Sequence, residues 1–594
     1  MSESLFHVRA PMQALVVAVR ARVGDAVAAG QALLVLEAMK MEHIVSAERS
    51  GIVKEVLARP DQMVSAGDPL LLLETAEHVE AVVAADEPTP LDQIRPDLAD
   101  LKARLAFGFD ANRPEAVAER RKTGQRTARE NIADLVDDGT LVEYGALVIA
   151  AQRRRRSMED LVKRTPADGM VAGIGRINGA LFGESRTQCV VVSYDYTVLA
   201  GTQGTMNHLK KDRMLELAEQ RRLPVVLFSE GGGGRPGDTD HAIVAGLDCR
   251  AFQYFAALSG KVPLVGVNSG RCFAGNAALL GCCDVVIATK ASNIGMGGPA
   301  MIEGGGLGVF APEAIGPSAT QYRNGVIDVL VDDDTEAVSA AKKYLSYFQG
   351  PLGNWSCADQ RLLRSAIPEN RLRVYDVRKV IETLADNDSV LELRGGFGAA
   401  IVTALGRVEG KPVGIIANNP MHLGGAIDGE AADKASRFMK LCSTFGVPLV
   451  FLCDTPGFMV GPDAEETGLV KRAASLFTAG ASLEVPFCTI VLRKGYGLGA
   501  QSMAGGSFKA PAFTISWPTG EFGGMGLEGA VKLGFRKELE AVENPAEREK
   551  MFQHMVEQLY ERGKAVNVAA HFELDAVIDP IESRAWICSA ISPS

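Results

Sequence analysis

The chain has 594 residues, of which 47% are hydrophobic and 23% are charged, and it contains 63 glycines. This length exceeds what one hydrophobic core supports, so we expect several domains in a turn-rich α/β chain. The net charge of -11 is spread along the sequence and gives no basic field, which excludes a nucleic acid partner. The ten cysteines include no C-x-x-C pair, so we expect neither a disulfide framework nor a bound metal.

The N-terminal segment MSESLFHVRAPM lacks the apolar core that a secretory signal needs. No apolar run in the chain reaches the roughly 18 to 20 residues needed to cross a bilayer. We therefore expect a cytoplasmic protein with no membrane partner.

A short repeat predicts the first domain. Residues 22–37 read RVGDAVAAGQALLVLE and residues 59–74 read RPDQMVSAGDPLLLLE, so one turn-then-strand pattern returns after 37 positions. Each copy has a glycine turn followed by an apolar run that must bury against its twin. We predict a small all-β sandwich over residues 1–75.

One lysine stands midway between the two copies, in the hexapeptide EAMKME that begins at Glu37. A sandwich with two similar halves needs an exposed hairpin there to join them. The segment resembles the biotinyl carrier domains of biotin-dependent carboxylases, whose attachment lysine lies in A-M-K-M at the hairpin tip, and residues 10–12 resemble the A-P-M entry of that family. The resemblance implies covalent biotin on Lys40, flanked by Met39 and Met41, with a biotin protein ligase as partner. An ordinary surface lysine or a lipoyl domain of the same architecture is the alternative, and the two methionines favour biotin.

Residues 76–95 are rich in Ala, Glu and Pro and continue neither neighbouring pattern. We interpret them as a flexible linker, which would span roughly 70 Å when fully extended. As a flexible coil it would span about 25 Å. The tethered domain could therefore visit sites tens of ångströms apart.

A longer repeat predicts two related domains in the rest of the chain. LPVVLFSEGGG around Pro224 returns as VPLVFLCDTPG after 224 positions, and KVPLVGVNSGRCFAGNA returns as EVPFCTIVLRKGYGLGA after 223. Two further matches at an offset of 224 are Ala200-Gly201 with Gly424-Gly425, and Lys210 with Lys434. Short apolar runs followed by helical patterns indicate buried strands with βα order. We predict α/β domains over residues 96–345 and 376–594, joined by a connector over 346–375.

Seven segments of this region, taken in order, resemble the acyl-CoA carboxyltransferase family. They are RKTG at 121–124 with TARE at 127–130, LVDDG at 135–139, ADGMVAG at 167–173, DYTVLAGTQG at 195–204, DTPGFMVG at 454–461, RKGYGLGA at 493–500 and WPTGEFGGMGLEGA at 517–530. The resemblance implies two tandem crotonase-like domains of the ββα-superhelix type. It also implies an active site where the N-terminal half of one subunit meets the C-terminal half of another. At least a dimer follows, and the family commonly forms a hexamer.

The resemblance further implies an activity, the transfer of a carboxyl group from carboxybiotin to the α-carbon of an acetyl-, propionyl- or longer acyl-CoA. Such chemistry needs stabilisation of two developing oxyanions, one on the thioester and one on the biotin ring, and main-chain N–H groups in glycine turns at helix starts can supply it. The positions that match the family are Gly275-Asn276 and Leu498-Gly499, and which pair serves which oxyanion is left open. The alternative is that these turns have a structural role only, as tight connections between a strand and a helix.

Other positions match the substrate side of the family's site. We expect substrate contacts at Gly201, Gly233, Gly234, Arg235, Gly424, Gly425, Ala500 and Gln501. The small Ala500 would enlarge the acyl pocket and admit longer chains. The glycine run at 231–234 lacks the spacing and the Lys-Ser/Thr of a P-loop, so we expect no nucleotide site there. The arginines at 153–156 are interpreted as a solvated stretch, with CoA phosphates as the alternative partner.

The predicted domains use all 594 residues and leave no room for an ATP-grasp segment. We therefore expect a separate biotin carboxylase subunit, which alone would need ATP, bicarbonate and magnesium. Two other functions remain open, a biotin-dependent decarboxylase or transcarboxylase, and a weakly active carrier or scaffold. A crotonase-type hydratase or isomerase is disfavoured because it would not need a biotinyl lysine.

Overall fold

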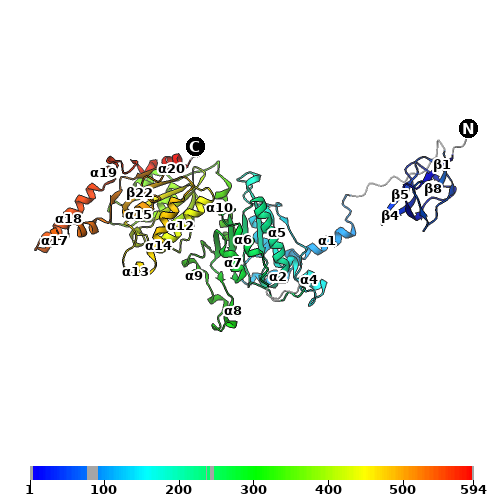
Figure 1. Cartoon of the computed structure of the whole chain (residues 1–594), viewed down its shortest axis with the longest axis horizontal. Coiled ribbons are helices and arrows are strands. Elements are labelled where there is room, and N and C mark those ends of the chain that lie inside the picture. The colour runs from blue at the N-terminus through cyan, green and yellow to red at the C-terminus, as the bar shows by residue number, and fades with distance from the viewer. Residues whose placement is uncertain (1–4, 76–90, 236, 241–245, 592–594) are drawn as a thin grey trace. The chain divides into compact units, whose positions relative to one another are not determined.

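The computed structural model describes residues 5–75, 91–235, 237–240 and 246–591 (Figure 1). These residues form two compact units, divided between Ala99 and Asp100. Most of the predicted linker lies outside the described residues. None of the described helices combines the length and the apolar character that crossing a bilayer requires.

The first unit contains the predicted sandwich, which is confirmed. Its two sheets have the strand orders β1-β8-β6-β3 and β5-β4-β2-β7, and all their pairings are antiparallel. The strands are β1 (Leu5–Arg9), β2 (Ala14–Val19), β3 (Ala26–Val27), β4 (Ala32–Ala38), β5 (Met41–Ser46), β6 (Gly51–Val56), β7 (Met63–Val64) and β8 (Pro69–Thr75). Strands β6, β7 and β8 begin and end 37 residues after β2, β3 and β4. The apolar runs that the repeat marks, at 33–36 and 70–73, meet in one core.

The second unit begins with the first α/β half. Its sheet has the order β17-β15-β13-β12-β11-β10-β9, parallel from β11 to β17 and antiparallel at β9 and β10. Its strands are β9 (Val142–Glu143), β10 (Met170–Arg176), β11 (Gln188–Tyr194), β12 (Val225–Phe228), β13 (Leu264–Asn268), β15 (Val285–Thr289) and β17 (Val329–Val331), and β14 (Arg271–Phe273) pairs with β16 (Asn293–Gly295). Its helices are α1 (Pro96–Ala106), α2 (Pro114–Arg121), α3 (Ala128–Leu135), α4 (Met158–Arg164), α5 (Thr205–Arg221), α6 (Ala251–Ala257), α7 (Gly275–Gly281), α8 (Pro299–Gly304), α9 (Ser318–Arg323) and α10 (Asp334–Gln349).

The second α/β half repeats this plan. Its sheet has the order β18-β19-β20-β21-β22-β23-β25, with β24 pairing to β22. Its strands are β18 (Leu391–Leu393), β19 (Ile401–Val408), β20 (Lys411–Asn418), β21 (Leu449–Thr455), β22 (Phe487–Tyr496), β23 (Thr514–Ser516), β24 (Glu521–Gly523) and β25 (Ala576–Val577). Its helices are α11 (Val377–Leu384), α12 (Gly429–Thr444), α13 (Pro462–Glu466), α14 (Leu469–Ala481), α15 (Gly497–Ser502), α16 (Leu527–Gly534), α17 (Arg536–Glu540), α18 (Pro545–Arg562), α19 (Ala565–Ala570) and α20 (Ser583–Ile591). Helices α17 and α18 project from this half (Figure 1).

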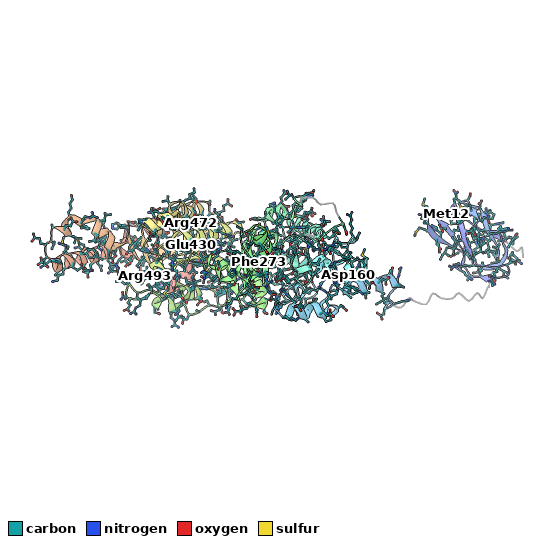
Figure 2. All side chains as sticks on the ribbon, turned by 90° about the horizontal axis from the view of Figure 1, so that it is seen from below. Met12, Asp160, Phe273, Glu430, Arg472 and Arg493 are labelled. Carbon is teal, nitrogen blue, oxygen red and sulfur yellow. The ribbon has the colours of Figure 1, made fainter. Side chains whose placement is uncertain are left out.

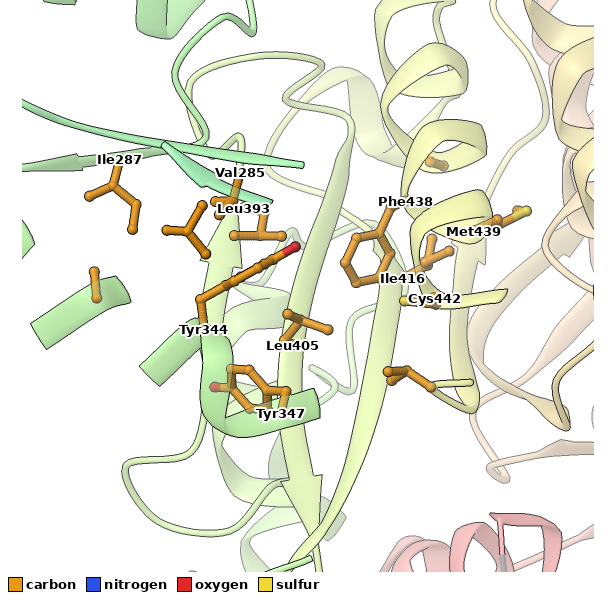
Figure 3. Packing of buried hydrophobic residues seen from close by; sticks show 14 of the residues in the cluster. Val285, Ile287, Tyr344, Tyr347, Leu393, Leu405, Ile416, Phe438, Met439 and Cys442 are labelled. Carbon is orange, nitrogen blue, oxygen red and sulfur yellow. The ribbon is translucent and has the colours of Figure 1, made fainter. Parts of the chain in front are cut away.

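The two halves share one hydrophobic core. Figure 3 shows Tyr344 of α10 between Val285 of the first half and Leu405 of the second, with Tyr347 of the same helix near Leu405, and all of these side chains are buried. Helix α10 is the last helix of the first half. Its apolar face packs against both sheets at once. The duplicated domains are therefore packed as one body, which fixes the position of each half relative to the other.

Candidate functional site

The predicted carrier lysine lies at the tip of the β4–β5 hairpin. Ala38 pairs with Met41 across the ladder, so Met39 and Lys40 are the two turn residues. Both have left-handed backbones, with φ of 52° and 62°, as a two-residue turn of this type requires. Met39 is 98% exposed, and Lys40 is also exposed. An amine held out in solvent fits a group attached through an amide bond, and no neighbour would have to move.

A turn of three consecutive left-handed residues occurs at equivalent positions in the two halves of the second unit. In the first half, Leu199 and Ala200 precede Gly201, and their φ values are 50°, 53° and 63°. In the second half the corresponding values at 423–425 are 51°, 63° and 88°. Left-handed non-glycine residues are costly, by roughly 1–2 kcal/mol each, so repeated occurrence indicates a geometry that the fold retains.

The segment after each turn makes the same hydrogen bonds. Gln203 N–H donates to Gly233 O at 2.7 Å, and the Arg235 N–H donates back to Gln203 O at 2.7 Å. The residues 224 positions later repeat both contacts, Ile427 to Gly457 at 3.0 Å and Met459 to Ile427 at 2.9 Å. The predicted substrate residues Gly201, Gly424 and Gly425 therefore belong to two equivalent main-chain frames.

Each frame packs against the start of a short helix. A Cβ on Gly233 would lie 2.8 Å from the Cβ of Ala274, directly before α7. A Cβ on Gly499 in α15 would lie 2.7 Å from the Cα of Gly457. The helix starts and the glycine loops are thus close enough that glycine is required at the contact. A Cβ on Gly234, by contrast, would meet open space.

The N–H groups in the first turn of α7 and α15 have no acceptor within their own helix. Gly275 begins α7, and Leu498 and Gly499 lie in the first turn of α15. Leu498 is 62% exposed, while the side chain of Asn276 is completely buried. Such N–H groups can donate to a negatively charged oxygen, and the positive end of the helix dipole adds to the attraction.

Asn276 connects three segments of the first frame. Its Nδ2 donates to Gly201 O at 3.2 Å and to Glu230 O at 2.7 Å, and its Oδ1 accepts from Gln203 Nε2 at 3.0 Å. Phe273, labelled in Figure 2, lies just before this turn. The side chain of Asn276 thus holds the turn in place, and its backbone N–H remains in the first turn of the helix.

A buried ion pair lies next to the first frame. It was not predicted from the sequence. Arg120 of α2 donates to both carboxylate oxygens of Glu230, at 2.8 and 2.7 Å. Both side chains are at most 10% exposed. Glu230 is also the first residue of the loop that carries Gly233. The ion pair therefore holds the start of that loop in place.

The second half has a related pair. Arg493, labelled in Figure 2, contacts Asp454 Oδ2 through Nε at 3.2 Å and Nη2 at 3.1 Å. Tyr375 Oη donates to the same oxygen at 2.8 Å, and Lys494 N–H donates to Oδ1 at 3.0 Å. The sequence did contain a signal for these carboxylates, because Asp454 follows Glu230 at the repeat offset of 224.

Arg235 is enclosed by acceptors. Its guanidinium contacts Asp168 at 2.7 Å and Asp238 at 3.1 Å, and it donates to Thr202 O at 3.2 Å, with 5% of the side chain exposed. Burial raises the pKa of Asp168, and Arg235 opposes that effect. The side chain therefore secures the loop at 231–235 and is not free to pair with a separate anion.

A hollow of about 630 Å³ opens next to the first turn. Leu199, Thr202, Arg155 and Arg156 are among the residues that line it. Arg155 is exposed, and Arg156 is half-buried in an ion pair with Asp160 at 2.8 Å. Two of the four arginines that were interpreted as a solvated stretch thus border a cavity that reaches the Gly201 turn.

The two predicted acyl-pocket residues point in different directions. Ala500 is 2% exposed, whereas Gln501 is exposed, although both lie in α15. The structure therefore brings Ala500, not Gln501, into the packed side of this turn. Among the described residues there is no cluster of His, Cys, Asp and Glu side chains able to hold a metal ion.

An exposed lysine at the hairpin tip of a small sandwich, together with two equivalent main-chain frames, fits a group-transfer enzyme with a tethered cofactor. Residues 119–593 match the family model described as a carboxyl transferase domain, and residues 7–73 match that of a biotin-requiring enzyme. The chain therefore belongs to the carboxyl transferase family and carries a biotin-requiring domain at its N-terminal end.

Named relatives agree with this assignment. The chain is 33% identical over 496 residues to the methylmalonyl-CoA carboxyltransferase 12S subunit of Propionibacterium freudenreichii subsp. shermanii, covering 80% of this chain and 90% of the relative. It is 32% identical over 510 residues to the biotin-dependent long chain acyl-coenzyme A carboxylase beta4 subunit of Mycobacterium tuberculosis, covering 82% and 92%. These matches identify the chain as a biotin-dependent carboxyltransferase.

Two solved structures extend the likeness to the fold. A single-chain, multi-domain long-chain acyl-CoA carboxylase is 56% identical, with a TM-score of 0.81 over 99% of this chain. The present chain spans 56% of the length of that protein. The transcarboxylase 12S hexamer with methylmalonyl-CoA bound is 30% identical, with a TM-score of 0.71 over 85% of this chain and 96% of that one. The predicted crotonase-like carboxyltransferase fold is confirmed.

Proposed function

We propose that this enzyme moves a carboxyl group, carried by biotin on Lys40, onto the α-carbon of an acyl-CoA thioester. The observation that supports it most directly is the duplicated frame with a short helix packed against each copy, because the first turns of α7 and α15 offer two sets of main-chain donors for two negative oxygens. Gly275-Asn276 and Leu498-Gly499 are the residues we assign as those donors. The carrier hairpin and the family match supply the cofactor.

Biotin, when bound, supplies the nitrogen that carries the carboxyl group. The protein stabilises the charge that develops on oxygen, because first-turn N–H groups of α7 and α15 are already oriented and need no reorganisation. Loss of one such donor in other enzymes lowers kcat by about 10²–10³-fold. The α-proton would pass to the biotin nitrogen that releases the carboxyl group, so the chain needs no dedicated histidine or carboxylate at the reacting carbon.

We assign the thioester to the first half and biotin to the second. The hollow lined by Arg155 and Arg156 supports this assignment, since cationic side chains suit the phosphates of CoA. That hollow reaches Thr202, which follows the Gly201 turn. The frame at Gly425 and Gly457 is then left for the biotin ring.

We propose that the active unit is a homo-oligomer, at least a dimer and in the full assembly a hexamer. The related 12S transcarboxylase is a hexamer, and this chain covers 96% of it. A biotin protein ligase and a biotin carboxylase activity are the further partners, and a cytoplasmic location would give both access to the chain. ATP, bicarbonate and magnesium belong to the carboxylase activity alone.

Long acyl chains are our proposed substrates. Two relatives are described as long-chain acyl-CoA carboxylases, and the side chain of Ala500 is small, so it would take little room from an acyl chain. A transcarboxylase is the second candidate, because the 12S subunit of that enzyme is 33% identical. The first candidate requires ATP and bicarbonate, and the second requires a carboxylated donor instead.

The test uses the full chain with a biotin carboxylase, and it compares wild type with Lys40→Ala. We expect ATP-dependent carboxylation of acyl-CoA to be lost in Lys40→Ala. The same variant should keep decarboxylation of a malonyl-type CoA ester when free biotin is supplied, because the transferase halves are intact. Undiminished ATP-dependent carboxylation in Lys40→Ala would overturn the proposal, and product formation from methylmalonyl-CoA and an acceptor without ATP would favour the transcarboxylase.

A further inference from the structure

We propose that the transferase unit has a second binding site, which takes a small oxyanion of the carboxylate or phosphate class. The site is a cavity of about 200 Å³ between its two halves. Asp284 and Asp328 of the first half line it, together with Arg394, Lys434, Arg437 and Lys440 of the second half. None of these residues belongs to the duplicated frames described above.

The charges around this cavity do not balance. The carboxylate of Asp328 is already engaged, since Oδ1 accepts from Arg394 Nε at 2.7 Å and Oδ2 accepts from Val286 N–H at 2.8 Å. Asp284 therefore faces Arg437 and Lys440, together with Lys434 whenever the amine of Lys434 is protonated. An additional negative charge is what this surrounding favours, and a metal cation is excluded by the same excess.

Two of these cations have spare donors. Lys434 is 1% exposed, and its Nζ donates to Phe397 O at 2.9 Å. An ammonium has three donors, so one carbonyl does not satisfy it. The guanidinium of Arg437 makes no hydrogen bond or ion pair within the described part of the chain, and Arg437 is an exposed residue of the cavity lining. A ligand can therefore enter past Arg437 and reach Lys434.

A third donor lies behind the cavity wall, because Tyr344 points toward two of the lining residues without lining the cavity itself. The hydroxyl of Tyr344 is buried and has no hydrogen-bond partner among the described residues. Figure 3 shows the Tyr344 side chain pointing toward Leu393 and Phe438, and both of these residues line the cavity. Burial raises the pKa of Tyr344, and the nearby charges of Asp284 and Asp328 add to the rise, so the hydroxyl stays protonated as a donor.

The size of the cavity limits the occupant. A volume of about 200 Å³ is below the range of drug-sized ligand pockets, which hold about 300–1,000 Å³, so a nucleotide or an acyl-CoA is too large. Inorganic phosphate or a short dicarboxylate fits. Because both halves line the cavity, an oxyanion there would join them and stabilise the arrangement that carries the two frames.

Protonation of Lys434 gives the site a pH dependence. Burial lowers the pKa of Lys434 to about 7, Glu392 and Asp328 act to raise it, and Arg378 and Arg394 act to lower it. A bound anion favours the charged ammonium. Binding is therefore strongest below this pKa and weakens as the pH rises through it, because Lys434 must then first be protonated, which costs free energy. Burial also raises the pKa of Asp284 to about 6, so this carboxylate loses its proton as the pH rises and then repels the anion as well.

The test measures the melting temperature of the full chain by differential scanning fluorimetry, with phosphate or succinate against chloride at matched ionic strength. We expect a saturable rise in the melting temperature of the wild type. In Arg437→Met the apparent affinity should fall at least tenfold, whereas Lys471→Met, which removes an exposed charge of α14 outside the cavity, should behave as wild type. Arg437 lies at the surface, so its removal leaves the core intact.

Calorimetric titration of the same three proteins with succinate, which stays a dianion near and above neutral pH, gives a second readout. Wild-type binding that weakens at higher pH and is at least tenfold weaker in Arg437→Met supports the site. Equal stabilisation of all three proteins, or no saturable binding by the wild type, would overturn it. Neither measurement uses biotin or CoA, so failure here would leave the proposed carboxyl transfer untouched.

Discussion

Glu230 and Asp454, 224 residues apart, each accept hydrogen bonds from a buried arginine at the carboxyl end of a central strand. The carboxylate is therefore duplicated, but its partner is not. Arg120 comes from α2, before the first sheet, whereas Arg493 comes from β22 of the second sheet. Both halves thus place a neutralised carboxylate next to the frame, but the arginine that neutralises it comes from a different part of each half.

This relationship predicts a positioning role for Glu230. Glu230→Gln leaves Arg120 as an uncompensated buried charge, and loss of one partner of such a pair costs about 3–5 kcal/mol. We expect a lower melting temperature together with a fall in kcat, because the loop that carries Gly233 begins at this residue. The KM for acyl-CoA should change less than kcat, since the hollow at Arg155 does not involve Glu230.

Arg121→Gln is the matched control for Glu230→Gln. Arg121 adjoins Arg120 in sequence and pairs with Glu130, but its side chain is 52% exposed. Exposed pairs contribute about 0–1 kcal/mol, so we expect near wild-type stability and rates. If Arg121→Gln lowers kcat as much as Glu230→Gln does, the effect is not specific to the buried pair.

The sequence predicted what depends on local pattern. The 37-residue repeat anticipated the sandwich and the two apolar runs, at 33–36 and 70–73, that meet in its core, and the offset of 224 anticipated the paired turns at Gly201 and Gly425. Each of these features is encoded within a few neighbouring residues, by apolar alternation or by a glycine that must adopt a left-handed backbone.

The contacts that sequence reasoning missed join distant segments. Arg120 and Glu230 are 110 residues apart, and Arg394 meets Asp328 across the boundary between the halves. No local periodicity reports such a pairing, because it depends on how complete domains pack. Local pattern also did not separate Ala500 from Gln501. These residues are neighbours in α15, but only Ala500 is buried, because the helix turns the two side chains in different directions.

The second frame predicts a strict glycine requirement at 499. The Cβ added by Gly499→Ala would lie 2.7 Å from the Cα of Gly457, so helix and loop must separate and the first-turn donors must shift. We expect kcat to fall by about 10²-fold or more, in line with the loss of an oxyanion donor. Steady-state rates with a biotinylated carrier would measure this.

Gly534→Ala provides the comparison for this substitution. A Cβ at Gly534, the last residue of α16, meets nothing within 4 Å, and its backbone is not left-handed. We expect unchanged kcat and equal or slightly higher stability, because alanine favours helix over glycine by about 1 kcal/mol. Equal kcat losses in the two variants would argue against a contact-specific cause.

The arginine-lined hollow predicts a binding effect that depends on salt. In Arg155→Gln with Arg156→Gln, we expect the KM for acyl-CoA to rise by about tenfold at low ionic strength, while kcat is retained. The difference from wild type should shrink as salt is added, because exposed charges are screened. Arg153→Gln, which removes an exposed arginine that does not line the hollow, should leave KM unchanged. An unaltered KM in the double variant would indicate that these arginines are solvated and do not bind the phosphates of CoA.

Ala500 predicts the acyl-chain preference. If this buried residue borders the acyl chain, the added methyl groups of Ala500→Val shorten the pocket, and a change of one methylene in such a pocket is worth about 1–3 kcal/mol. We expect kcat/KM for a long-chain acyl-CoA to fall by tenfold or more, with acetyl-CoA nearly unaffected, so that the ratio of the two reports pocket depth. Gln501→Ala, at the exposed neighbouring position, should preserve the ratio. Because misfolding would lower both rates together, only a change in the ratio supports this role, and a wild-type enzyme that accepts acetyl-CoA alone would contradict the long-chain assignment.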